Sequence, residues 1–433
     1  MKAFTPYLSH LEELLVASVC LPANKIRQQQ VKAALDGQPS AELRKRVSLD
    51  RLRAAGAFFT GSRMAQRAVV AAGLPRLKTV ARVFDPACGV GDLLVAFVNH
   101  LSCASDLEST LSHWSSRVIA LDVHPEFVRA TKLRLALAGV VRHPLVKPFQ
   151  LRDFDLLFPS VAVGSSLVEE RSYKEASHIL VNPPFTLVHA PEECCWGEGK
   201  VNSAALFMDA CAANAEVGTQ LMAILPDVLR SGSRYEKWRK SFEQSVAIKK
   251  IEIMGRFDRH TDVDVFVVVG QVRKKPNDKR GIPWTPDKKT GGKRISDKFE
   301  VSVGAVVSYR DPHSGPWYPF VQARDLPSWQ AVTQIAHNRR FEGKTVIPPF
   351  VVVRRTSRPE DRNRAVATLV RGKRHIAVEN HLLVLRPKDK TLRTCEHLLK
   401  LLHEQRTNEL LNRRIRCRHL TVSALGDLPW RDE

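Results

Sequence analysis

The sequence lacks long apolar runs. No stretch of its 433 residues approaches the roughly 18 uninterrupted apolar residues of a membrane-spanning helix. The amino terminus also lacks the pattern of a secretion signal. Its eight cysteines are too few for a disulfide scaffold, none forms a Cys-x-x-Cys pair, and the fifteen histidines do not cluster with carboxylates at metal-ligand spacing. We therefore expect a cytoplasmic protein with no membrane segment and no metal.

Acidic residues are scarce relative to basic ones. The chain has 45 Asp and Glu against 67 Lys and Arg, a formal net charge of +22. The excess lies mainly in residues 271–433, which carry 34 basic and 17 acidic residues, whereas residues 1–270 carry 33 and 28. A basic second half favours a polyanionic partner such as nucleic acid. A solvated basic surface is the alternative that charge alone leaves open.

The apolar pattern predicts an α/β protein of two or three domains. Residues 1–55 have helical periodicity and form a short helical N-terminal segment. Apolar runs then alternate with amphipathic stretches, which predicts a doubly wound, Rossmann-like sheet over residues 56–272. The expected strands are 80–85, 117–122, 178–182, 220–225, 247–254 and 264–272, and the expected helices are 93–101, 126–139 and 203–215.

The second half of the chain follows a different pattern. Residues 273–298 are rich in Lys, Pro, Gly and Asp, which is typical of a basic linker. Residues 299–433 contain short β-like runs, a helical stretch near 392–412 and the tail RHLTVSALGDLPW. We expect a separate mixed α+β domain there.

A glycine-rich turn is predicted after the first strand of the sheet, at Asp85-Pro-Ala-Cys-Gly-Val-Gly-Asp92. Glycines at the carboxyl end of a strand let a ligand approach the backbone closely. The second strand ends at Asp122, where a carboxylate can accept hydrogen bonds from ribose hydroxyls, unless it only caps the following helix. Asp153-Phe154 follows the third candidate strand and suits a purine, a surface turn being the alternative.

The second strong motif is Asn182-Pro183-Pro184-Phe185, directly after an apolar run. The prolines stiffen the turn and remove backbone donors, so that carbonyl oxygens are free to accept from a ligand. The Asn182 side-chain oxygen and the Pro183 carbonyl could together hold a planar amino group, and Phe185 could stack on its ring. An aryl amine is a poor nucleophile because its lone pair is delocalised, and two acceptors would localise that pair. A purely structural turn is the alternative.

These motifs together resemble a known enzyme family. GAFFTG (56–61), DPACGVGD (85–92), the strand end at Asp122, Asp153-Phe154 and NPPF (182–185) occur in the order found in gamma-class S-adenosylmethionine-dependent N6-adenine DNA methyltransferases of restriction–modification systems. The resemblance covers residues 50–270 well, and residues 418–430 are loosely similar to the end of the family's target recognition domain. It departs at Gly61, where the family usually has proline.

The resemblance implies a role for each matching position. Asn182, Pro183, Pro184 and Phe185 would be catalytic, and Phe185 would stack on the target base. Phe257 falls where the family places a second aromatic against that base, although a core phenylalanine is an equal alternative. S-adenosylmethionine would be bound by Thr60, Asp85, Ala87, Gly89, Gly91, Asp122, Asp153 and Phe154.

The basic carboxyl-terminal half fits the same activity. Chemistry on a base inside duplex DNA requires flipping the nucleotide out of the stack, and this needs a grip on the flanking backbone. Some of the arginines could instead read guanine edges, and the last cluster could be only a solvated helix face. The candidate DNA-binding residues are Arg354, Arg355, Arg371, Lys373, Arg374, Arg413, Arg414, Arg416 and Arg418.

The sequence thus predicts a site-specific, adenine-specific DNA methyltransferase with S-adenosylmethionine as cofactor and duplex DNA as partner. No nuclease motif is evident, so a separate restriction endonuclease chain is a candidate partner. Two alternatives remain. One is a methyltransferase that acts on RNA adenine or protein glutamine through the same NPPF site. The other is a catalytically silent, nucleic-acid-binding subunit of a defence complex.

Overall fold

The computed structural model describes residues 2–21, 24–74, 81–143, 156–258, 261–274, 282–285 and 292–432. The chain forms two compact units. The first comprises residues 1–229 and 236–282, and the second comprises residues 230–235 and 283–433. Among the described residues, no helix is both long and apolar enough to cross a membrane.

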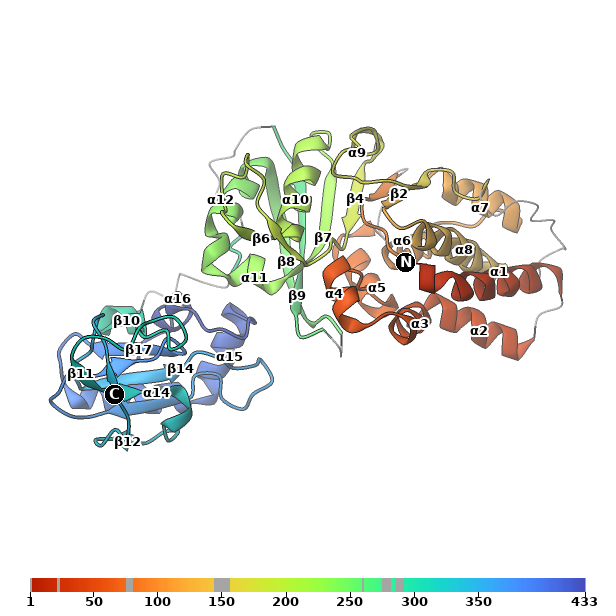
Figure 1. Ribbon diagram of the computed structural model, residues 1–433. Coiled ribbons are helices and arrows are strands. Elements are labelled where there is room, and N and C mark those ends of the chain that lie inside the picture. Colours follow the sequence, from red (N-terminus) through yellow and green to blue (C-terminus); the bar gives the residue numbers. More distant parts are fainter. Residues whose placement is uncertain are drawn as a thin grey trace. The chain divides into compact units, whose positions relative to one another are not determined.

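The first unit contains the elements expected from the alternating pattern (Figure 1). Its helices are α1 (Thr5–Cys20), α2 (Lys25–Leu35), α3 (Gln38–Arg46), α4 (Leu49–Ala55), α5 (Ser62–Ala71), α6 (Asp92–Val98), α7 (Leu107–Ser115), α8 (Pro125–Arg142), α9 (Arg171–Glu175), α10 (Ser203–Asn214) and α12 (Glu236–Ser245). Its strands are β1 (Val83–Asp85), β2 (Val118–Asp122), β3 (Val161–Val163), β4 (His178–Val181), β5 (Leu187–His189), β6 (Lys200–Asn202), β7 (Gln220–Pro226), β8 (Val246–Arg256) and β9 (Asp264–Val272).

One sheet organises this unit. Its strand order within the described residues is β3-β2-β1-β4-β7-β9-β8. The pairs from β3 to β7 are parallel, whereas β9 runs antiparallel to both β7 and β8. The α/β class is therefore confirmed, and the antiparallel edge is an addition to the predicted pattern. Because β1, β2 and β4 are adjacent and parallel, the polar residues that follow them meet at one edge of the sheet.

Both faces of the sheet are covered. Strands β4 and β9 are buried along almost their whole length, which requires packing on each side. Helices α5 and α8 pack against α6, whereas α10 packs against α9 and α12. Figure 1 shows α10 and α12 away from α5, α6 and α8, with the strands between the two groups. The apolar runs of the sequence are thus explained by burial on two faces.

Helices α1, α2, α3 and α4 lie within residues 5–55, and they belong to the first unit. Helices α1 and α2 both pack against α8 (Figure 1). Leu11 and Leu15 of α1 share one buried core with Phe127 of α8. The amphipathic spacing of the segment arises because one face of each helix is covered by the sheet-bearing part of the unit.

A fully buried arginine on α8 joins three parts of this unit. The Arg134 guanidinium donates to the carbonyls of Ala34 (2.8 Å) and Leu35 (3.1 Å), at the end of α2, and to that of Val90 in the turn after β1. It also forms an ion pair with Asp92 (2.9 Å). A buried charge is tolerated only when it is paired and hydrogen-bonded, and here both conditions hold.

The second unit is mixed α and β. A five-stranded sheet has the order β10-β17-β14-β15-β12, and a three-stranded sheet has the order β13-β11-β16. Helix α14 packs against β14, β15 and β17. The elements are α13 (Ile295–Lys298), β10 (Phe299–Val303), β11 (Trp317–Val321), β12 (Ala331–Val332), β13 (Asn338–Arg340), β14 (Phe350–Arg354), β15 (Ala367–Val370), β16 (Ala377–Val378), β17 (Leu382–Pro387), α14 (Leu392–His403), α15 (Gln405–Arg414) and α16 (Val422–Gly426).

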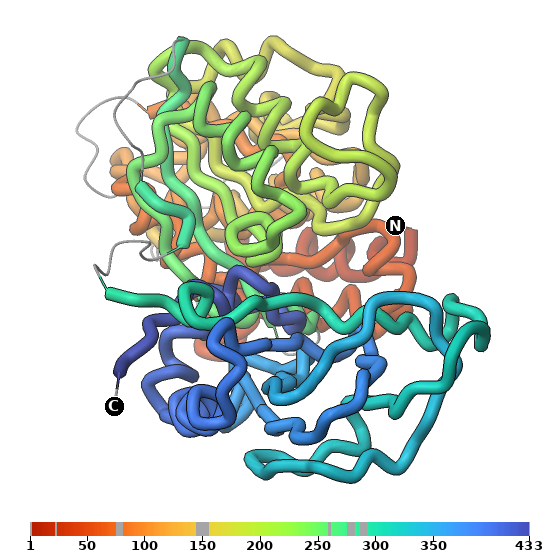
Figure 2. The backbone as a smooth tube through the Cα atoms, turned by 90° about the vertical axis from the view of Figure 1, so that its left-hand side faces the viewer, coloured from red at the N-terminus to blue at the C-terminus, as the bar shows by residue number. Residues whose placement is uncertain are grey.

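A linker was expected over residues 273–298, but part of this segment is packed into the second unit. Ile295 is fully buried in the core of the second unit. Its amide donates to the Leu428 carbonyl, and the Lys293 carbonyl accepts from the Trp430 amide. Figure 2 shows the end of the chain beside the start of this unit. Residues 292–298 therefore belong to the second unit, because Ile295 anchors them there.

Replacing Arg134 by methionine should destabilise the first unit strongly. The variant leaves the Asp92 carboxylate buried without its cation, which typically costs about 3–5 kcal/mol. Arg129, also on α8, pairs with Glu12 at 2.5 Å in a more exposed setting, so Arg129→Met should cost less than about 1 kcal/mol. Urea denaturation followed by circular dichroism measures both. Equal losses for the two variants would contradict this account.

Candidate functional site

The glycine turn begins where β1 ends. Gly89 and Gly91 have φ of +53° and +79°, in the left-handed region, and Gly91 caps the start of α6. A Cβ at Gly91 would lie 2.7 Å from Thr131 Cγ2, which is closer than real side chains approach. Glycine is therefore required at position 91 both by the backbone angle and by packing against α8.

Asp122, at the end of β2, faces this turn. Its Oδ2 accepts from the Gly89 amide and its Oδ1 accepts from the His124 amide, each at 2.9 Å. Burial raises the pKa of the Asp122 carboxyl, and these two amides oppose the rise. The carboxylate is thus fixed in orientation at the mouth of the turn, and each oxygen keeps a lone pair for a further donor.

Asp85 lies deeper than Asp122. Its side chain is almost fully buried, and its Oδ1 accepts from the Ala87 amide at 3.1 Å. The pKa of Asp85 is raised to about 8, mainly by burial; the Ala87 amide opposes this rise, and the carboxylates of Asp122 and Asp92 add to it. Asp85 therefore shapes the turn from behind, whereas Ala87 and Gly89 line the cavity in front of it.

The Asn182–Phe185 loop follows β4 and is held by the start of α10. The Ser203 hydroxyl donates to the Pro184 carbonyl (2.6 Å), and Asn202 Nδ2 donates to the Phe185 carbonyl (3.2 Å). Asn202 Oδ1 also accepts from the Ala204 amide and so caps the helix. The helix expected over 203–215 is observed as α10, and its capping residue Asn202 also positions the loop.

The Asn182 side chain is anchored at its nitrogen and unpaired at its oxygen. Nδ2 donates to Thr60 Oγ1 at 3.0 Å. Oδ1 is buried and accepts no hydrogen bond, which is uncommon for a buried polar atom. Within the described part of the chain, no donor reaches the Pro183 carbonyl either. Two oxygens of adjacent residues thus accept no hydrogen bond from the described part of the chain.

The segment before Thr60 also touches this loop. Gly56 ends α4 with φ of +62°, and a Cβ there would lie 2.4 Å from Pro184 Cβ. On the other side of Thr60, the Gly61 amide donates to Asp92 Oδ2 at 2.7 Å. The GAFFTG segment is therefore fixed between the NPPF loop and the glycine turn. The hydroxyl of Thr60, expected to contact the cofactor, accepts from Asn182 here.

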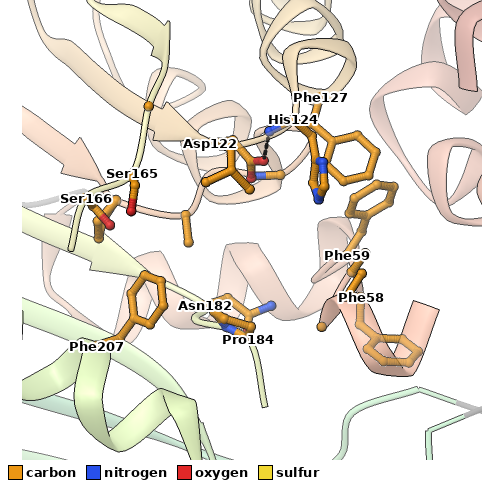
Figure 3. A pocket seen from close by; sticks show the side chains of 18 residues that line it. Phe58, Phe59, Asp122, His124, Phe127, Ser165, Ser166, Asn182, Pro184 and Phe207 are labelled. Carbon is orange, nitrogen blue, oxygen red and sulfur yellow. Dashed lines mark hydrogen bonds between the residues drawn. The ribbon is translucent and has the colours of Figure 1, made fainter. Parts of the chain in front are cut away.

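One cavity joins the two motifs. In Figure 3, Asp122 lies across the cavity from Asn182 and Pro184. Aromatic side chains border one side of the cavity, and two serines and Phe207 border the other. Its lining from these motifs and their neighbours includes Phe58, Phe59, Ala87, Gly89, Asp122, His124, Phe127, Ser165, Ser166, Asn182, Pro184 and Phe207.

Several lining residues were not expected. The rings of Phe59 and Phe127 meet edge to face at 5.1 Å, and His124 meets Phe127 at 5.0 Å. The motifs singled out from the sequence include neither His124 nor Phe207, yet both line the cavity. Phe207 is only partly buried and lines the cavity. The sequence position of His124 and Phe127 could have indicated this role, because both come shortly after Asp122 at the end of its strand.

The third strand differs from the expectation. The strand that pairs with β2 is Val161–Val163, and it comes after Asp153-Phe154 in the sequence. Gly164, Ser165 and Ser166 follow this strand and line the cavity. Asp153-Phe154 thus precedes β3 in the sequence, and both the pair and the residues directly before it lie outside the described residues.

The two candidate base-stacking aromatics lie together. The rings of Phe185 and Phe257 are 5.7 Å apart in an edge-to-face arrangement. Phe257 is only 6% exposed and belongs to the core of the first unit, whereas Phe185 is partly exposed against it. Phe257 therefore supports Phe185 from the core.

The candidate DNA-binding residues of the second unit differ in their surroundings. Arg354 donates to the Leu326 carbonyl (2.8 Å), and Arg355 donates to the Asn380 carbonyl (3.5 Å). Arg371 pairs with Glu396 (2.6 Å).

The remaining candidates are more exposed on average. Arg414 is paired with Asp427 (3.3 Å), and Arg416 is partly buried. Lys373, Arg374, Arg413 and Arg418 are exposed. In the described ranges, no group of three or more His, Cys, Asp or Glu side chains could hold a metal ion.

Comparison with known proteins gives likeness of fold only. No family model and no curated protein matches the chain. Three solved structures illustrate the likeness. The type IIG restriction endonuclease BpuSI has a TM-score of 0.46 and 13% identity, with 92% of this chain and 61% of that chain covered.

The second is the type IIL restriction–modification enzyme MmeI, in complex with DNA, with a TM-score of 0.44, 12% identity and coverage of 89% and 66%. The type I restriction enzyme EcoKI M protein has a TM-score of 0.38, 14% identity and coverage of 63% and 64%. This chain thus spans less than two thirds of the length of each of the three.

The raised pKa of Asp85 predicts a pH-dependent stability. A carboxyl that holds its proton more tightly when folded stabilises the fold below its unfolded pKa of about 4, and this contribution is lost as the pH rises towards 8. Asp85→Asn keeps an oxygen for the Ala87 amide but has no titration. Relative to wild type, its free energy of unfolding should therefore rise between pH 5 and 8.5, by up to about 1.4 kcal/mol per pH unit.

Urea denaturation across this pH range measures the effect. The control is Asp106→Asn at the start of α7, because hydrogen bonds from Ser109 lower the pKa of that exposed carboxyl. Its difference from wild type should not change over the same range. A pH-independent difference for Asp85→Asn would refute the assignment.

Proposed function

We propose that this chain is a site-specific DNA methyltransferase that transfers a methyl group from S-adenosylmethionine to N6 of adenine in duplex DNA. Its first unit would be a doubly wound methyltransferase domain, and its second would be the target recognition domain. In biological context, it would be the modification component of a restriction–modification or related system, with the nuclease on a separate chain.

The observation that carries the proposal is the unpaired Asn182 Oδ1. A buried amide oxygen without a donor costs stability, so a fold keeps it where a ligand supplies the donor. The neighbouring Pro183 carbonyl is a second acceptor of the same kind. Two adjacent acceptors match the two hydrogens of one exocyclic amine, because an amino group donates twice.

The same cavity would hold the cofactor. Gly89 has no Cβ where the turn faces the cavity, and the fixed Asp122 carboxylate suits ribose hydroxyls. Phe207, Ser165 and Ser166 border one side of this cavity and suit a flat base. When bound, S-adenosylmethionine would supply a methyl group already activated by its sulfonium, so the reaction needs only correct placement of the amine.

The residues would act by positioning. Asn182 and Pro183 would hold the amine with its lone pair directed at the methyl carbon, and Thr60 would keep the Asn182 oxygen turned towards the amine. With S-adenosylmethionine bound, the amine held by these residues would form the new N–C bond as the C–S bond breaks, the thioether would leave with the bonding electrons, and the amine would lose one proton to solvent. Holding two reactants in line can supply much of the rate increase.

Two features of the chain support adenine in DNA as the substrate. Phe185 is partly exposed beside the two acceptors and is held by Phe257, so its ring can stack on a flipped base. The second unit adds the charge expected of a nucleic-acid partner, since residues 271–433 carry twice as many basic as acidic residues.

Replacing Asn182 by alanine should abolish methyl transfer without preventing cofactor binding. Loss of an orienting group in the transition state typically costs on the order of 100-fold or more in rate. Transfer to duplex DNA is measured as N6-methyladenine by mass spectrometry of digested nucleosides, and cofactor binding is measured by calorimetry. Asn99→Ala, on the exposed end of α6, is the matched control and should behave as wild type.

Robust methylation by Asn182→Ala would refute the assigned role. Wild-type transfer to structured RNA or to a glutamine peptide, with none to duplex DNA, would assign the same site to another substrate. No cofactor binding by the wild type would instead indicate a silent nucleic-acid-binding subunit.

Gly56→Ala should slow methyl transfer through the NPPF loop. The added Cβ would displace Pro184 and so move the two acceptors. Gly73→Ala is the control, because Gly73 also has a positive φ of +76° but has open space around its Cβ position. Both variants should lose about 1–2 kcal/mol from backbone strain, and Gly56→Ala should lose more because its Cβ also meets Pro184. Only Gly56→Ala should lower kcat, and equal rates in the two variants would contradict the role of this contact.

A further inference from the structure

The second unit carries a hollow on its surface, and the residues that line it are distant in sequence from those that line the cavity. Its lining includes Trp317, Tyr318, Asn338, Lys373, Arg374 and His375. Strand β11 supplies the aromatic residues, the adjacent β13 supplies Asn338, and the loop after β15 supplies the basic residues. Aromatic and cationic side chains from three segments therefore meet at one place on the surface.

The aromatic side of this hollow is open to solvent. Trp317 is 68% exposed, although tryptophan is normally well buried in a folded protein. Directly opposite Trp317 on β13 lies Arg340, which is exposed and is held by a bond from Nε to the Gly315 carbonyl (2.8 Å). Directly paired residues share one face of a sheet, so this cation accompanies the indole.

The other side of the hollow is basic, and one of its side chains, His375, is held by contacts with its neighbours. His375 accepts or donates at Nδ1 with the Thr345 hydroxyl (2.9 Å), and its ring lies 6.4 Å from that of Tyr318. Lys373 and Arg374 are exposed, whereas Arg371 just before them pairs with Glu396. Among the described residues, no carboxylate lines the hollow, so its charge suits a phosphate.

We propose that this hollow binds an unstacked nucleotide of a nucleic-acid strand. The base would stack on Trp317, and the flanking phosphates would contact Lys373 and Arg374. A paired duplex presents base edges and phosphates but hides the faces of its bases, so an exposed indole gains most from a strand whose bases are open. The inference rests on the proposed function for nucleic acid as the partner, and it adds a second nucleotide site outside the methyl-transfer cavity.

The test measures binding of the full chain, without cofactor, to a short fluorescent single-stranded DNA by anisotropy. Trp317→Ala should weaken this binding by about 5- to 150-fold, the usual range for one stacked base, and should change binding to the fully paired duplex much less. The control is Tyr309→Ala, because Tyr309 is 88% exposed in the same unit but does not line the hollow.

The phosphate contacts are tested by a double variant, Lys373→Ala with Arg374→Ala. It should lower the dependence of log affinity for single strands on log salt by about 1.4, which corresponds to two phosphate contacts. Arg358→Ala with Arg362→Ala removes the same charge from the loop before β15, at the other end of that strand from the hollow. The salt dependence of single-strand binding should fall less in this control than in the Lys373→Ala, Arg374→Ala variant.

The possible results distinguish base stacking at Trp317 from general binding of polyanions. Unchanged single-strand binding by Trp317→Ala overturns the inference, and so does an equal loss of binding to heparin, a polyanion without bases. A loss confined to strands with unpaired bases supports it. Because no cofactor is present, this result stands apart from methyl transfer. Normal methylation together with no Trp317 effect would overturn only the second nucleotide site.

Discussion

The ion pair between Asp92 and Arg134 is the constraint on which the candidate site depends. Arg134 binds the end of α2 and the glycine turn, and Asp92 in turn accepts from the Gly61 amide. Gly61 follows Thr60, whose hydroxyl holds the Asn182 nitrogen. One buried charge pair thereby fixes the relative positions of the N-terminal helices, the glycine turn and the side chain that we assign to the target amine.

This arrangement explains why the NPPF loop can keep unpaired acceptors. The loop is fixed by contacts to its other groups. Ser203 and Asn202 donate to its carbonyls, Gly56 packs against Pro184, and Phe257 supports Phe185. Within this fixed loop, Asn182 Oδ1 has no hydrogen-bond partner in the described part of the protein. The resulting cost in stability is the expected price of a preorganised binding site.

The sequence predicted the sheet well because its signals are local. Apolar runs that end in Asp85, Asp122 and Asn182 marked three parallel strands, and all three strands occur where expected. Contacts between distant segments had no such signal. The bond from Asn182 to Thr60 joins residues 122 positions apart, and Arg134 looks like any basic residue of an amphipathic helix. In the second unit, Ile295 is an isolated apolar residue in a polar run. The sequence therefore predicted a linker there, although Ile295 is buried in the core.

A structure of the chain bound to S-adenosylhomocysteine tests the central claim most directly. The sulfur should lie in the cavity between Asp122 and Asn182, no more than about 8 Å from Asn182 Oδ1, because one amine and one methyl group must fit between them. The ribose should contact Asp122. A sulfur bound elsewhere, or separated from Asn182 by protein, would contradict the assignment of this cavity to methyl transfer.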